Sequence, residues 1–235
     1  MIDQSEIAQL NKQFENSNPQ EIILYFIKRF NDRITFATSF GAEDQVITDM
    51  IASIEKPCEI FTLDTGRMFP ETYNILERTR MKYNFNIKVF FPEYHAVEKM
   101  VLEHSINLFY DSVENRKLCC SIRKTEPLER ALQNKEAWIC GLRREQSVTR
   151  KDINVVEWDE QHQMLKINPL INWTEEQVWD YIKTKHIPYN KLHDQGFRSI
   201  GCQPCTRAAQ EGEDVRSGRW WWEDPQHKEC GLHRK

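Results

Sequence analysis

Five of the seven cysteines in this chain occur in an arrangement that suits sulfur or redox chemistry. Cys119 and Cys120 are adjacent, and Cys202 and Cys205 form a Cys-x-x-Cys pair much later in the chain. Four thiolates brought together from distant segments are typical of a metal ion or an iron–sulfur cluster. The fifth, Cys230, lies in a polar, basic C-terminal segment, where a cysteine is more typical of a nucleophile. The pattern therefore predicts a thiolate-bound centre and a separate reactive thiol.

The spacing of the four paired cysteines favours a cluster over a single ion. A zinc ion holds its sulfurs at about 2.3 Å, whereas adjacent residues of a helix or strand point their side chains apart. A cube of several irons is larger and accepts such diverging neighbours. We therefore expect one 4Fe–4S cluster on these four cysteines, with zinc as the alternative.

The two remaining cysteines are expected to be structural. Cys58 begins the apolar run 58–63, and Cys140 ends the run 137–140. Both runs are typical of buried strands, where a free cysteine behaves as a small hydrophobic side chain.

Length and charge limit the kinds of partner that the chain can have. Its 235 residues suit one large domain with a tail or two small domains, and 40% hydrophobic residues are enough for a substantial core. A net charge of −4 gives no general attraction to nucleic acid, so an anion site must come from local clusters of cations. The polar N-terminus and the absence of an apolar run of about 18 residues indicate a cytoplasmic protein without a membrane partner.

Expected strands and helices alternate along most of the chain. Two helices are expected over residues 3–31, with a break at Pro19. The expected strands are 33–38, 58–63, 87–91 and 138–140, and the helices between them are 46–54, 70–83, 93–104 and 121–134. A hairpin over 153–167 and a capped helix over 174–185 follow. This alternation predicts an α/β fold with a parallel sheet that helices cover on both faces.

The composition of the sequence changes after residue 187. The hydrophobic periodicity ends there, and Gly, Pro, Arg and Trp become frequent. We therefore expect a nucleotide-binding α/β domain over 1–187 and a loop-rich extension over 188–235. The three consecutive tryptophans at 220–222 are expected to dock this extension onto its own domain.

Three loops that follow expected strands are candidates for ligand binding, because open parallel sheets bind ligands beyond the carboxyl ends of their strands. The loop 39–44 offers a hydroxyl, a glycine and backbone amides at the start of a helix, which suits phosphate or sulfate but also fits a plain turn. The loop 64–67 begins with Asp64, whose carboxylate suits a ribose or an adenine edge. The loop 141–147 carries two arginines that suit an anion.

Basic residues also accompany the paired cysteines. They are Arg116, Lys117, Arg123 and Lys124 around the first pair, and Arg216 and Arg219 after the second. Such cations bind oxyanions and stabilise thiolates and a negatively charged cluster.

Together these segments resemble the assimilatory adenylyl-sulfate reductases, the thioredoxin-dependent enzymes of sulfate assimilation. The matching segments are 39–44, 63–73, 119–124, 141–147, 200–206, 218–222 and 228–233. The resemblance implies an adenine-nucleotide α-hydrolase-like fold, which is a Rossmann-like parallel sheet flanked by helices. The loop 39–44 departs from the glycine-richer pyrophosphate loop of ATP-hydrolysing relatives, which fits a substrate that is already activated.

The resemblance also implies a reaction in two steps. The Cys230 thiolate attacks the sulfur of adenosine 5′-phosphosulfate (APS), AMP leaves, and a Cys–S–SO₃⁻ thiosulfonate remains. Thioredoxin then attacks the cysteine sulfur and releases sulfite, while the cluster organises the site without a net redox change. The residues expected to bind the substrate are Ser39, Gly41, Lys124, Arg143, Arg144, Arg150, Arg216, Arg219 and His233.

Several alternatives stay open at this point. The same fold serves reductases of 3′-phosphoadenosine 5′-phosphosulfate (PAPS), which usually lack the four cluster cysteines, and some cluster-bearing members accept both substrates. More remote alternatives are a nucleotide α-hydrolase that thiolates transfer RNA and a zinc-binding interaction module. The sequence is compatible with a homo-oligomer.

Overall fold

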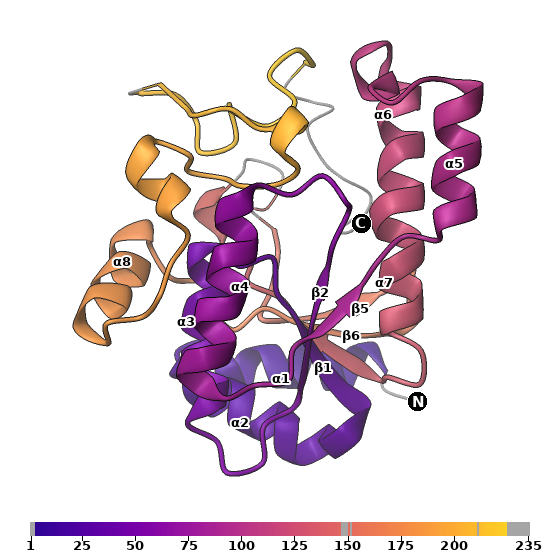
Figure 1. Ribbon diagram of the computed structural model, residues 1–235. Helices are drawn as coiled ribbons and strands as arrows, with labels where there is room; N and C mark the ends of the chain where they lie inside the picture. Colours follow the sequence, from indigo (N-terminus) through magenta and orange to yellow (C-terminus); the bar gives the residue numbers. More distant parts are fainter. Residues whose placement is uncertain (1–2, 147–149, 151, 211, 225–235) are drawn as a thin grey trace.

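A computed structural model describes residues 3–146, 150, 152–210 and 212–224, and Figure 1 shows its ribbon. Two helices, α1 (Gln4–Phe14) and α2 (Pro19–Phe30), open the fold. Asn18 caps α2 by accepting a hydrogen bond from a backbone amide, and Pro19 occupies its first turn. The expected break at Pro19 is therefore confirmed.

The sheet has six strands in the order β3-β2-β1-β4-β6-β5. All neighbouring pairs are parallel except β5 and β6, which form the expected antiparallel hairpin. The strands are β1 (Ile34–Ala37), β2 (Glu59–Leu63), β3 (Lys88–Phe90), β4 (Ala137–Ile139), β5 (Val156–Asp159) and β6 (Met164–Ile167). The predicted α/β class is confirmed.

Helices cover both faces of this sheet. They are α3 (Ala42–Ala52), α4 (Pro70–Tyr83), α5 (Tyr94–Glu103), α6 (Val113–Cys120), α7 (Glu126–Ala131) and α8 (Glu175–Thr184). Figure 1 shows α3 and α4 on one side and α7 on the other. The chain adds β2 and β3 on one side of β1 and then returns to add β4 on the other side. Because the crossover connections are right-handed, the helices of the two halves must cover opposite faces of the sheet. The order in which strands are added therefore changes direction between β1 and β4, the switch point of the sheet.

The helix expected over 121–134 differs from the structure. Helix α6 already begins at Val113, where the Ser112 hydroxyl accepts a hydrogen bond from a backbone amide, and a π turn over Ser121–Thr125 links it to α7. The buried residues of α6 are Arg116 and Cys120. Hydrophobic periodicity cannot reveal a helix whose buried side chains are a cation and a thiol.

Two hydrophobic clusters hold the described residues together. The larger one surrounds the sheet, where Ile34, Phe36 and Phe61 are completely buried. The smaller one includes Leu108, Trp220 and three of the paired cysteines. The expected docking of the extension through its tryptophans is confirmed, because Trp220 is completely buried in this second cluster and Trp222 packs against it.

The two isolated cysteines are buried as expected. Cys58 lies directly before β2 and Cys140 directly after β4. Burial raises the pKa of the Cys58 thiol to about 12 and also raises that of Cys140. Both thiols are therefore protonated at neutral pH, as structural cysteines are.

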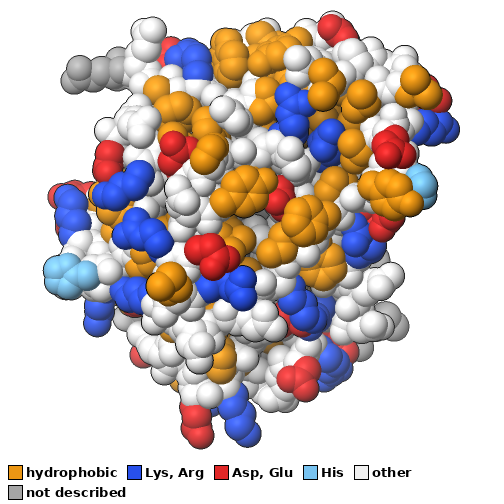
Figure 2. Space-filling view, in the orientation of Figure 1, with side chains coloured by type: hydrophobic (Ala, Val, Ile, Leu, Met, Phe, Trp, Pro, Cys, Tyr) orange, Lys and Arg blue, Asp and Glu red, His pale blue; other side chains and the backbone are white. Residues whose placement is uncertain are grey.

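Figure 2 shows hydrophobic side chains gathered over the upper part of the face seen in Figure 1, with Lys and Arg among them. The exposed apolar residues of the described chain include Leu102, Ile106 and Tyr110. Tyr110 packs on Trp222, with ring centroids 4.5 Å apart, and its hydroxyl donates to the Pro204 carbonyl. None of the described helices combines the length and the apolar character needed to cross a bilayer.

Candidate active site

A cavity of about 230 Å³ lies at the carboxyl ends of β1, β2 and β4, and the C-terminal extension forms its opposite wall. It lies where the direction of the sheet reverses, which is the usual ligand site of an open α/β sheet. Six of the residues expected to bind the substrate line it: Ser39, Gly41, Lys124, Arg150, Arg216 and Arg219.

Three of these cations lie around one buried aromatic ring. The charged groups of Lys124, Arg216 and Arg219 lie 5.9, 6.0 and 4.8 Å from the ring centroid of Trp220. Cations at this distance are attracted to the face of an indole. The Trp220 amide donates to the carbonyl of Cys205 at 3.1 Å, so the same residue joins the cationic wall to a paired cysteine.

Gly201 makes room for one of these cations. A Cβ atom at this position would lie 2.3 Å from a guanidinium nitrogen of Arg219. Any side chain here would displace the Arg219 guanidinium, which is itself buried. A glycine directly before Cys202 therefore determines where a cation of the cavity can lie.

The four paired cysteines line a second, smaller cavity next to the first. Cys119 and Cys120 end α6, and the turn that holds the other pair is fixed by a hydrogen bond from the Gln203 amide to the Arg67 carbonyl. The Thr65 hydroxyl lies 3.2 Å from the sulfur of Cys202, and Thr65 also lines the larger cavity. The structure thus brings all four cysteines together, beside the predicted anion site.

Burial and mutual repulsion make two of these thiols, those of Cys119 and Cys205, hard to ionise. They raise the pKa of Cys119 to about 11 and that of Cys205 to about 12, while the charge of Lys124 acts in the opposite direction. Within the described part of the chain, no group of three or more His, Cys, Asp or Glu is arranged to hold a metal ion. The four thiols share one cavity, and the centre that they hold stays a proposal.

A buried ion pair joins the cysteine cavity to the end of the described extension. The Arg116 guanidinium donates from Nε and Nη2 to the two carboxylate oxygens of Glu223, at 3.0 and 2.7 Å. Both side chains are almost fully buried, and Arg116 also stacks 4.7 Å from the Trp220 ring. Bidentate geometry of this kind holds a segment in one orientation, here the end of the described extension at Glu223.

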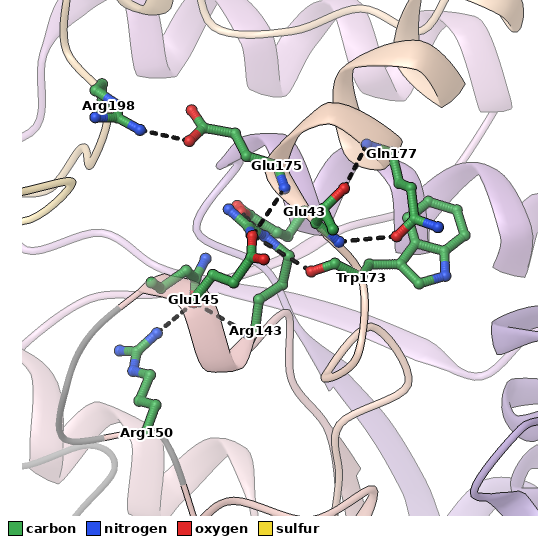
Figure 3. A network of polar contacts seen from close by, with 10 residues as sticks. Glu43, Arg143, Glu145, Arg150, Trp173, Glu175, Gln177 and Arg198 are labelled. Carbon is green, nitrogen blue, oxygen red and sulfur yellow. Dashed lines mark hydrogen bonds and ion pairs between the residues drawn. The ribbon is translucent and has the colours of Figure 1, made fainter.

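Two arginines expected at the anion site lie elsewhere. Arg143 is buried outside the larger cavity, and its Nε donates to the Glu43 carboxylate at 2.7 Å (Figure 3). Arg144 donates to the Ile153 carbonyl and to the Asn172 side chain. Arg143 thus joins loop 141–147 to α3, and Arg144 joins the same loop to residues further along the chain.

The polar contacts of Arg143 extend to Arg198, a cation that the sequence analysis did not identify. Arg198 lines the larger cavity and pairs with Glu175 at 2.5 Å, at the start of α8. The Glu145 carboxylate accepts from the Glu175 amide and from Arg143, which completes a chain of contacts from loop 39–44 to the extension (Figure 3). His193 also lines the cavity, and its Nε2 is buried without a hydrogen-bond partner in the structure.

Loop 39–44 is organised around a buried carboxylate. The amide and the hydroxyl of Ser39 both donate to Asp44 Oδ2, at 2.6 and 2.7 Å. Burial raises the pKa of Asp44 to about 6, although the hydrogen bonds from Ser39 oppose this effect. The Ser39 hydroxyl, which was expected to bind phosphate, thus donates its proton within the protein.

This buried carboxylate makes stability depend on pH. Between pH of about 4 and 6 the folded protein keeps a proton on Asp44 that the unfolded chain has lost, so the free energy of unfolding falls as pH rises through this window. Above a pH of about 6, the free energy of unfolding is roughly 3 kcal/mol lower than below a pH of about 4. We expect Asp44→Asn to be more stable than the wild type at neutral pH and to lose this pH dependence. Urea unfolding of both proteins across the window tests this, and parallel pH profiles would contradict it.

Two predicted residues lie outside the described residues. These are Cys230, expected as the nucleophile, and His233, expected to bind the substrate. Their roles stay predictions.

The family model for the phosphoadenosine phosphosulfate reductase domain matches residues 33–208 of the chain. A protein from Allochromatium vinosum described as adenosine 5′-phosphosulfate reductase is 52% identical over 204 residues, which cover 87% of this chain and 80% of that protein. The solved phosphoadenylyl-sulfate reductase of Candida auris, a phosphate complex, aligns with a TM-score of 0.77 and 30% identity, over 88% of this chain and 98% of that one. The FMN adenylyltransferase of Candida glabrata aligns with a TM-score of 0.57 and 14% identity, over 100% and 79%, which shows a shared fold alone.

Proposed function

Because the chain belongs to the phosphoadenosine phosphosulfate reductase domain family, we propose that it reduces APS to sulfite and AMP, with thioredoxin as the reductant, in sulfate assimilation. The observation that carries this proposal is the cavity in which Lys124, Arg216 and Arg219 gather on Trp220 beside four cysteines. The relative that is 52% identical is described as an APS reductase, whereas the Candida auris PAPS reductase is 30% identical. This difference favours APS over PAPS.

The reaction balances as two displacements at sulfur. The Cys230 thiolate forms a bond to the sulfur of APS, the bond from that sulfur to the bridging oxygen breaks, and AMP leaves with the electron pair. One thioredoxin thiolate then attacks the Cys230 sulfur and expels sulfite. The second thioredoxin thiol resolves the mixed disulfide, so thioredoxin is oxidised and Cys230 returns as a thiol.

The cationic wall makes the first displacement feasible. A thiolate and a sulfate group repel one another, and AMP gains negative charge as it leaves, so positive charge must lie at both positions. Lys124, Arg216 and Arg219 supply it from one wall of the cavity, and Arg150 lines the same cavity. Leu63, Met68 and Leu142 add apolar surface that suits the adenine ring. We propose that His233 and the backbone at Gly41 complete the substrate contacts, while Ser39, which donates to Asp44, shapes the loop around them.

The Trp220 ring should matter to catalysis without touching the reacting atoms. Trp220→Ala removes the face on which three cations are held, and each lost contact is worth about 0.5–2 kcal/mol. We expect kcat/KM for APS to fall by about 10- to 100-fold. Trp220→Phe keeps an aromatic face and is the matched control, expected to retain most of the activity. Equal losses in both variants would contradict a role for the aromatic face at this position.

We also propose that Cys119, Cys120, Cys202 and Cys205 hold a 4Fe–4S cluster. The donor set fits, because four soft thiol ligands line one cavity that basic side chains, among them Arg67 and Arg123, also line. Such cations offset the negative charge of a thiolate-ligated centre. When bound, the cluster would supply an electrostatic field to the neighbouring anion site rather than electrons. Lys124 lines both cavities and is the side chain best placed to respond to that field.

Sulfite release is the experiment that tests the proposed function. Anaerobically purified protein with reduced thioredoxin should release sulfite and AMP in equal amounts from APS, and only background amounts from PAPS. Comparable kcat/KM values for the two substrates would favour the dual-substrate alternative. Absence of sulfite with both substrates would overturn the proposal.

A further inference from the structure

Residues 206–219 of the extension form a loop that begins directly after Cys205 and ends directly before Trp220. A β bridge joins the first and last residues of this loop, and the Arg207 amide donates to the Gly218 carbonyl at 2.9 Å. A Cβ atom on Gly218 would lie 2.1 Å from the Arg207 carbonyl oxygen, so a glycine is needed for this close approach. Loop 206–219 therefore leaves the cysteine pair and returns to the ring that the cations surround.

The carboxylate of Glu213 connects the two arms of this loop. Its two oxygens accept from the Arg207 guanidinium at 3.1 and 3.2 Å. Its Oε2 also accepts from the Gln210 amide at 2.8 Å and from the Ser217 hydroxyl at 3.0 Å. These hydrogen bonds, above all those from Arg207, lower the pKa of Glu213 to about 2. The carboxylate is therefore charged at neutral pH and binds donors from both arms.

Loop 206–219 brings one particular cation to the larger cavity. Val215 and Arg216, which lie in the loop, both line that cavity. Lys124 comes instead from the π turn Ser121–Thr125, and Arg219 lies at the end of the loop, where it also donates to the Ile200 carbonyl at 3.3 Å. Arg216 is thus the cation of the wall whose place depends most on the shape of the loop.

The loop is attached to the α/β domain at the same glutamate. Arg198 donates from Nη1 to the Glu213 carbonyl at 3.3 Å, and its Nη2 pairs with Glu175 at the start of α8 (Figure 3). The side chain of Glu213 therefore sets the internal shape of the loop, and its main chain helps to fix where the loop lies.

We propose that Glu213 is a positioning residue for the reaction, whose carboxylate holds loop 206–219 in the shape that brings Arg216 to the anion site. Glu213 itself does not line the larger cavity, so it acts through Arg216 and not on the substrate. The inference rests on the proposed function in that Arg216 binds the anionic part of the substrate. It goes beyond that function because it assigns a role to a carboxylate outside the site.

Glu213→Ala should weaken substrate binding more than it slows turnover. Without the carboxylate, binding has to order the loop, whereas the bound complex has the same contacts as in the wild type. We expect the KM for APS to rise at least about tenfold and kcat to change less than about threefold. Glu213→Gln keeps an acceptor for the Gln210 amide but loses the charge that faces Arg207, so its KM should rise less. Steady-state sulfite release measures both constants, and thermal unfolding shows that each variant is folded.

A double-mutant cycle with Arg216→Ala separates positioning from a general loss of structure. If Glu213 acts through Arg216, adding Glu213→Ala to Arg216→Ala should change KM by less than about twofold. Glu6→Ala is the matched control, because Glu6 forms an ion pair of similar exposure with Arg29 on the first two helices. Its kcat/KM should stay within about twofold of the wild type.

Two results would overturn the proposal. One is an unchanged KM in Glu213→Ala, and the other is a full tenfold rise when that change is added to Arg216→Ala. Failure of the proposed function would show differently, as no sulfite from APS with the wild type. The same cycle, read from the affinity for AMP by calorimetric titration, would then still decide whether Glu213 positions Arg216.

Discussion

Cys230→Ser is expected to reduce turnover of APS by at least about a thousandfold. A serine hydroxyl is almost entirely protonated at neutral pH, whereas a thiol near cations ionises readily and is the stronger nucleophile. The variant should keep its iron and bind AMP as tightly as the wild type, because Cys230 belongs to neither cysteine pair. Steady-state sulfite release, iron analysis and AMP titration on the same preparations check these three expectations.

The matched control for this substitution is Cys140→Ser. Cys140 also lines the larger cavity, but burial keeps its thiol protonated. Cys140→Ser should retain sulfite release. Normal turnover in Cys230→Ser, or abolished turnover in a folded Cys140→Ser, would mean that the nucleophile has been assigned to the wrong cysteine.

Cys205→Ala is expected to remove the iron and acid-labile sulfide from the protein. Its sulfur lies with those of Cys119, Cys120 and Cys202 around one cavity, so no other described cysteine can replace it. Cys58→Ala is the control, because Cys58 is buried before β2, apart from that cavity, and its loss should leave the iron content unchanged. Metal and sulfide analysis of anaerobic preparations decides the outcome. Stoichiometric zinc without iron in the wild type would contradict the cluster and support the zinc alternative.

Much of the fold could be predicted from local patterns. The apolar strands β1, β2 and β4 follow from runs of β-branched and aromatic residues, and α8 follows from its capping box, in which Thr174 and Gln177 bond reciprocally. Helix α6 could not be predicted, because its burial comes from Arg116 and Cys120. These side chains are buried by partners that tertiary structure brings in, namely Glu223 and the other cysteines.

The sequence predicted several of the residues that line the candidate site, but it predicted few of the contacts that these residues make. Sequence motifs pointed to Lys124, Arg216 and Arg219, and the structure places all three on one cavity. They also pointed to Arg143, which instead pairs with Glu43, a partner 100 residues away in sequence. No local pattern could reveal that pairing.

The sequence did not reveal the roles that three residues, Trp220, Arg198 and His193, have at the candidate site. Trp220 was expected only to dock the extension, yet its ring orders the cations of the cavity. Arg198 and His193 follow no motif and reach the cavity only through the path of the extension.

In the proposed reaction, Cys230 attacks the sulfur of APS bound beside the cationic wall. Intact-protein mass spectrometry after incubation with APS, in the absence of thioredoxin, tests it most directly. We expect one sulfite-sized mass increase per chain, located on the peptide that carries Cys230, released by reduced thioredoxin and absent from Cys230→Ser. An adduct on another cysteine, or sulfite release from APS without any covalent intermediate, would contradict it.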